Sequence, residues 1–154
     1  MNLRQQQRDV VVERLAGIVT LVGCSCAIAG SFLPWIEATD PASGTTFTKA
    51  GIDGHYAMLV DLLALIAAVI GGFVILRRTR GAVLGLTLTL LAMAQLGIVI
   101  FVATNLSLGV VQLQAAGATA GLGLGIYLTG LGAVIALAGS FPVWRKAPLQ
   151  STIA

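Results

Sequence analysis

Charged residues are scarce in this chain of 154 residues: they make up 10% of it, against 57% for hydrophobic residues. A soluble domain carries about 25% charged residues, because its surface faces water. The shortage of charge excludes an ordinary soluble domain, and the hydrophobic content excludes a disordered chain. With a mean hydropathy of +0.96, the sequence predicts that most of the protein surface faces hydrocarbon.

Cysteine and histidine are also scarce, with two Cys and one His. Cys24 and Cys26 lie two residues apart, and on a helix their side chains point about 200° apart. They therefore favour neither a shared metal nor an unstrained disulfide. His55 and the few carboxylates near it fall short of the four fixed ligands of a zinc site, so we expect no metal and no cofactor. Residues 21–24 also fit a lipobox. Because the apolar run continues to Ile36, we interpret it as an uncleaved span, with lipidation of Cys24 as the alternative.

Four apolar runs are long enough to cross a bilayer, which needs about 20 helical residues. They cover residues 15–36, 56–76, 82–103 and 121–143. Each must be helical because hydrocarbon offers no partner to an unpaired backbone group, and none shows the alternation of a membrane β-barrel strand. The sequence therefore predicts an all-α fold, in which residues 1–154 form one integral membrane domain, an antiparallel four-helix bundle.

The basic residues gather at one end of the predicted spans. Only Lys49 lies elsewhere; the others are Arg4, Arg8, Arg14, Arg77, Arg78, Arg80, Arg145 and Lys146. The positive-inside rule places this end in the cytoplasm, so we expect both termini inside the plasma membrane. This placement makes the residues topology determinants. It also leaves no basic stripe for nucleic acid. Contact with anionic lipid headgroups is a secondary role expected of Arg77, Arg78, Arg80, Arg145 and Lys146.

The connecting segments divide between the two sides of the membrane. We expect residues 1–14, 77–81 and 144–154 in the cytoplasm, and 37–55 and 104–120 outside. The first outer loop combines turn residues at 40–44 with a β-prone run at 45–48, which favours a short hairpin. The second outer loop is uncharged and rich in aliphatic residues. Such a segment lies in the headgroup region, packs on the helices or covers a partner.

Asp61 is the one acidic residue inside a predicted span, and such residues are functional candidates. It lies about 7–8 Å below Tyr56 at helical rise. The other predicted spans place polar side chains at a similar depth: Ser31, Gln95, Tyr127 and Thr129. Three interpretations remain open: an outward-opening polar pocket, a buried network that orders the helices, or an Asp61 that reaches interfacial water. No Lys or Arg lies at this depth, so we expect a neutral, hydrogen-bonded carboxyl group.

Aromatic and small residues complete the pattern. Trp35, Tyr56 and Trp144 lie at span ends, where such rings anchor a protein in the membrane interface. Small residues line one face of the first predicted span: Thr20, Gly23, Ala27 and Ser31. Together with many glycines in the other spans, this face predicts close helix packing.

The sequence contains no nucleophile-and-base spacing, phosphate loop or metal motif, so we expect no enzyme. Its small size, close-packing glycines and apolar second loop favour an accessory, assembly or stabilising subunit of a larger membrane complex, with a membrane-protein partner or a homo-oligomer in the bilayer. The alternative is a transporter-like, channel-like or small-ligand-binding protein that uses the polar site around Asp61. The inner halves of the spans are almost entirely apolar, which disfavours a continuous polar pathway.

Three short features carry a resemblance. They are the Phe32-Leu33-Pro34-Trp35 exit from the first span, the loop end Ala50-Gly51-Ile52-Asp53-Gly54, and the Arg-bearing turn after the second span. Together they resemble small four-span integral membrane proteins of actinobacterial (high-GC Gram-positive) type. The resemblance implies the four-span architecture for the whole chain and no active site. A looser likeness to claudin-type proteins fails, because the paired loop cysteines typical of those proteins are absent.

Overall fold

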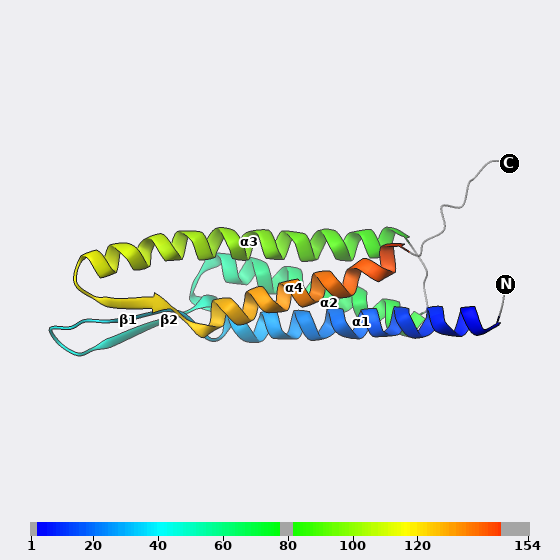
Figure 1. Cartoon of the computed structure of the whole chain (residues 1–154), viewed down its shortest axis with the longest axis horizontal. Helices are drawn as coiled ribbons and strands as arrows, with labels where there is room; N and C mark the ends of the chain where they lie inside the picture. Colours follow the sequence, from blue (N-terminus) through cyan, green and yellow to red (C-terminus); the bar gives the residue numbers. More distant parts are fainter. Residues whose placement is uncertain (1–2, 78–81, 146–154) are drawn as a thin grey trace.

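The computed structural model describes residues 3–77 and 82–145. Its elements follow in the order α1 (Leu3–Ser31), β1 (Pro34–Thr39), β2 (Thr46–Ala50), the short 3-10 helix η1 (Gly51–Asp53), α2 (His55–Arg77), α3 (Ala82–Ala115), β3 (Thr119–Leu122) and α4 (Leu124–Arg145). The helices lie side by side along one long axis (Figure 1). The strands gather at one end of this axis, opposite the start of α1 and the end of α4.

The four helices have the length and apolar composition of membrane spans. The qualifying segments are Arg14–Ser31, His55–Leu76, Val83–Ala115 and Leu124–Phe141. Large apolar side chains point outward along them; Leu65 of α2 and Leu90 of α3, for example, are both more than half exposed. This confirms the prediction of four helices able to cross a membrane, and by these criteria the chain is a multi-pass membrane protein.

The most extensive helix contact joins α1 and α4, which run antiparallel. Glycines seven residues apart line both sides of this contact: Gly23 and Gly30 on α1, and Gly125, Gly132 and Gly139 on α4. A Cβ atom added at Gly132 would lie 2.6 Å from the Gly23 carbonyl oxygen and 2.9 Å from the Ala27 Cα. Only glycine allows the two backbones to approach so closely, as in small-residue contacts between membrane helices.

A small sheet corrects the all-α prediction. β1 lies in the centre and pairs antiparallel with β2 on one side and β3 on the other. The β1–β2 hairpin forms where the turn residues and the β-prone run favoured it. β3 was not expected, because its four residues, Thr119–Leu122, are mostly small and follow no alternating pattern. Its partner strand lies some eighty residues earlier in the chain, so the pairing depends on the packing of the helices rather than on local sequence.

The sheet also corrects two predicted span boundaries. The first span was expected to reach residue 36, but α1 ends at Ser31 and residues 34–36 belong to β1. The fourth was expected from residue 121, but 121–122 belong to β3 and α4 begins at Leu124. The apolar residues at these ends prolonged the hydrophobic runs. In the structure they fill a layer between the sheet and the helices, where Leu122 packs against the buried cluster that contains Trp35.

The expected outer loop at 104–120 is mostly helix, which is a further correction. α3 continues unbroken to Ala115 and ends shortly before Gly117, whose φ of +92° suits glycine. The polar side chains of this segment do not interrupt the helix because they bond to its own carbonyl groups. Thr104 donates to Ile100 at 2.8 Å, and Asn105 donates to Phe101 at 2.7 Å. Similarly, α1 already begins at Leu3, within the segment expected to precede the first span.

Candidate functional site

Asp61 and Ser31 meet between α2 and α1 near the sheet end of the helices. The Ser31 hydroxyl donates a hydrogen bond of 2.8 Å to Asp61 Oδ2. Ser31 is fully buried in the last turn of α1, and Asp61 is half-buried in the second turn of α2. The other carboxyl oxygen, Oδ1, is buried without a hydrogen-bond partner among the residues that the structure describes. Among the described residues, one hydroxyl group thus donates to this carboxyl group.

Gln95 and Thr129 lie buried in the same layer and link other helix pairs. The Gln95 side-chain amide donates to the Val60 carbonyl at 3.2 Å, which joins α3 to α2 next to Asp61. The Thr129 hydroxyl lies 2.8 Å from the carbonyl of Gly125 in its own helix and 3.4 Å from that of Ala27 in α1. Gln95 Oε1, like Asp61 Oδ1, has no partner within the described residues. Ser31, Asp61, Gln95 and Thr129 therefore form a polar layer across all four helices.

Tyr127 does not join this layer. Its side chain is 61% exposed and faces away from the other helices. The depths estimated from the sequence were similar for Tyr127 and Thr129, but residues two apart on a helix point about 200° apart. Only Thr129 can therefore turn inward.

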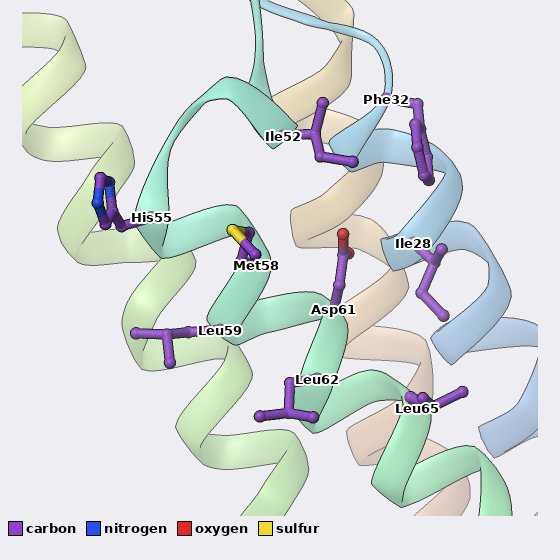
Figure 2. Close-up of a pocket in the computed structure, with 9 residues that line it drawn as sticks. All are labelled: Ile28, Phe32, Ile52, His55, Met58, Leu59, Asp61, Leu62 and Leu65. Carbon is purple, nitrogen blue, oxygen red and sulfur yellow. The ribbon is translucent and has the colours of Figure 1, made fainter.

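Asp61 lines a groove of about 810 Å³ between the halves of α1 and α2 that lie nearer the sheet. The other lining residues are almost all apolar: Ile28, Phe32, Ile52, His55, Met58, Leu59, Leu62 and Leu65. Figure 2 shows the Asp61 carboxyl in the middle of this set, below Ile52 and between Met58 and Ile28. His55 lies on the α3 side of α2, away from Phe32 and Ile28 (Figure 2). A single acidic side chain is thus set in an apolar groove that opens sideways.

The groove forms because glycines bring α1 close to α4 along its length, but close to α2 only away from the sheet. Along its length α1 is held against α4 by the glycine contacts described above. Away from the sheet α1 also approaches α2 closely, since a Cβ at Gly17 would lie 3.1 Å from Ile75 Cδ1. Toward the sheet end, the Ser31–Asp61 hydrogen bond joins α1 to α2, and the groove opens beside it.

Trp35 is buried inside the protein, whereas the sequence indicated a ring exposed to the membrane interface. Its indole is 5% exposed and packs with Ala57, Val60 and Val99 in the cluster beneath the sheet. The ring nitrogen donates to the Gly30 carbonyl at 3.0 Å. The anchor interpretation of Trp35 is therefore wrong: a register irregularity between Pro34 and Ile36 in β1 accompanies its inward orientation.

Tyr56 is half exposed at the start of α2 and makes an edge-to-face contact with Phe101 of α3, with ring centroids 5.8 Å apart. Trp144 and Arg145 belong to the last turn of α4, and Arg77 ends α2. Their side chains, and all of Arg78, Arg80 and Lys146, lie outside the described residues. Interface anchoring by Tyr56 and Trp144, and headgroup contact by the basic residues, stay predictions.

Cys24 is buried and Cys26 half-buried, and both are free thiols. Within residues 3–77 and 82–145, no three His, Cys, Asp or Glu side chains gather closely enough to hold a metal ion.

A second exposed feature is the end of α3 that lies beside the sheet. The Tyr56–Phe101 contact marks where α2 begins alongside it, and residues 102–115 continue about 20 Å further at helical rise. One side of this extension packs on the sheet through buried Val102 and Val110. The other side exposes aliphatic residues: Leu108 is 60% and Val111 61% exposed. From 82 to 144 the sequence contains no charged residue.

Comparison with known proteins adds no relative: no protein-family model matches the chain, and no curated protein matches it.

Proposed function

We propose that this protein is an accessory or assembly subunit of a larger membrane complex, in which the outer extension of α3 contacts a membrane-protein partner. The observation that carries the proposal is the exposed, uncharged face around Leu108 and Val111. A helix of 34 residues is about 51 Å long, whereas the hydrocarbon core is about 30 Å thick. Lipid tails therefore leave a large part of this face uncovered.

The kind of partner is inferred from the extent of this exposed face along α3. Leu108 and Val111 continue the outward face of α3 that includes Ile100 and Phe101, and all four side chains are more than half exposed. A partner that covers the whole face must itself pass from the outer surface into the bilayer. Exposed apolar patches of this kind usually mark interaction sites, and a second membrane protein fits this one best.

The orientation belongs to the same proposal. We place the four helices as an antiparallel bundle in the plasma membrane, with both termini in the cytoplasm and the three-stranded sheet outside. The positive-inside rule supports this orientation, because Arg14 of α1, Arg77 of α2 and Arg145 of α4 lie toward the helix ends opposite the sheet, whereas Lys49 lies in β2. The proposed role is not enzymatic: the Ser31 hydroxyl, which meets the Asp61 carboxyl group, is fully buried and out of reach of a substrate.

Site-specific photocrosslinking in native membranes tests the proposal. A photoreactive amino acid at Leu108 or at Val111 is expected to form an adduct with one integral membrane protein other than this chain. The matched control is Thr48, which is equally placed outside and exposed, but on the polar sheet face with Glu37. Adducts at Thr48 as strong as those at Leu108, or adducts only between copies of this chain, would contradict the accessory role.

A second candidate function is binding of a small ligand at Asp61. One observation favours it: a carboxyl group with a single hydroxyl donor lines an open apolar groove. The purified protein should then bind a membrane-soluble ligand in this groove, as detected by ligand-induced chemical-shift changes of groove residues.

A further inference from the structure

We propose that the groove between α1 and α2 binds a long-chain amphiphile whose polar head donates a hydrogen bond to Asp61. The head group is a hydroxyl or an ammonium, and the alkyl chain lies along Leu62 and Leu65. This inference rests on the second candidate function and names its ligand class.

The head-group chemistry follows from the unmet demand of the carboxyl group. A carboxylate offers about four lone-pair sites for hydrogen bonds, and the Ser31 hydroxyl occupies one of them. An acceptor left unpaired in apolar surroundings raises the free energy of the protein. The lining residues that lie beside Asp61 in the groove are hydrocarbon or thioether side chains. Because Oδ1 is buried, a donor in the groove would reach the carboxyl group at Oδ2, beside the Ser31 hydroxyl.

The apolar part of the ligand follows from the shape and place of the groove. Its volume of about 810 Å³ is within the range of small-molecule sites in proteins, roughly 300–1,000 Å³. Asp61 lies six residues into α2, which is about 9 Å below His55 at helical rise. A head group at Asp61 thus lies near the outer surface, and a chain that runs past Leu62 and Leu65 points toward the membrane centre. This is the orientation of an amphiphile in the outer leaflet.

The chain contains its own reporter and control for this site. Met58 lines the groove and is 64% exposed. Met93 is 57% exposed on α3 and is not a groove residue. Both methyl groups face the lipid, so nonspecific partitioning of a probe affects them alike. Binding in the groove changes Met58 alone.

The experiment uses the full chain in lipid nanodiscs with ¹³C-methyl methionine. Three probes share one alkyl chain: 1-dodecanol, dodecylamine and dodecyl methyl ether, which cannot donate a hydrogen bond. We expect the alcohol or the amine to shift the Met58 methyl signal saturably, with Met93 unchanged and the ether at least about tenfold weaker, as loss of one such hydrogen bond requires. Binding of the amine alone would identify an ammonium–carboxylate pair, and binding of the alcohol a neutral head group.

Two variants distinguish binding in the groove from nonspecific partitioning of the probes into the lipid. Asp61→Leu should weaken alcohol and amine binding at least about tenfold while ether binding stays unchanged. Leu62→Trp, at a lipid-facing position, should remove all three responses by filling the groove, and it serves if Asp61→Leu does not fold. An ether that binds as tightly as the alcohol would overturn the ligand class while leaving ligand binding intact. Absence of a Met58 shift with every probe, or equal shifts of Met58 and Met93, would overturn both.

Discussion

The glycine contact between α1 and α4 allows a quantitative test of the fold through Gly132→Ala. The added methyl group would lie 2.6 Å from the Gly23 carbonyl oxygen and 2.9 Å from the Ala27 Cα, where ordinary contacts are 3.4–4 Å. The two backbones must therefore separate by about 1 Å. Overpacking of this kind costs about 1–3 kcal/mol, and it is offset by up to about 1 kcal/mol from the better helix propensity of alanine.

Gly97→Ala is the matched control, because no atom lies within 4 Å of the position of its Cβ. Only the propensity term applies there, so this variant should be stabilised by up to about 1 kcal/mol. We expect Gly132→Ala to be less stable than Gly97→Ala by about 1–3 kcal/mol. The free energy of unfolding is measured by titration with a denaturing detergent in mixed micelles. Equal stability of the two variants would refute the close contact of α1 with α4.

Three further predictions concern single side chains. Ser31→Ala removes the donor to Asp61 and should destabilise the protein by about 0.6–1.7 kcal/mol in the same detergent titration. The control is Ser107→Ala, because the Ser107 hydroxyl donates to a carbonyl group of its own helix, α3. Equal effects of the two substitutions would contradict the Ser31–Asp61 hydrogen bond. Trp35→Phe loses a buried hydrogen bond, so it should destabilise the protein by about 1–3 kcal/mol. Size-exclusion chromatography after heating follows the loss of folded protein. Unchanged stability would contradict the buried position of the ring. The backbone amide of Ala42 and, to a smaller extent, the hydroxyl of Ser43 donate hydrogen bonds to Asp40 and hold its pKa below the usual range. These hydrogen bonds stabilise the turn fully above the unfolded-state pKa of Asp40, and the stabilisation is lost as the pH falls through the lower folded-state pKa. A ¹³C NMR titration of the carboxyl group should show the lowered pKa. A pKa in the usual range would contradict the turn geometry.

The sequence predicted what depends on local pattern. Four uninterrupted apolar runs require four helices, and turn residues before the run Thr45–Thr48 favoured the hairpin that forms. The small-residue face of α1 also lies where it was expected, with Gly23 and Ala27 against α4. These features depend on a period or a short motif, which a single chain displays directly.

Features that depend on distant parts of the chain were missed. Hydropathy ended the third span at residue 103, where polar residues begin, but α3 continues to Ala115 because Thr104 and Asn105 bond to carbonyl groups of the helix itself. β3 is strand only because it pairs with β1. Depth along a helix was read from residue number, but rotation about its axis was not, so Tyr127 was grouped with Thr129. Likewise, Trp35 was placed at the interface by its position at a span end, although it packs beneath the sheet.

Cysteine labelling of intact cells tests the proposed threading of the chain most directly. The wild type, with Cys24 buried and Cys26 half-buried within α1, gives the baseline. The account predicts that a membrane-impermeant maleimide labels Ala42→Cys, in the exposed hairpin turn, on intact cells. Arg145→Cys, at the opposite end of the helices, should be labelled only after lysis. Labelling of Arg145→Cys on intact cells, with Ala42→Cys protected, would contradict it.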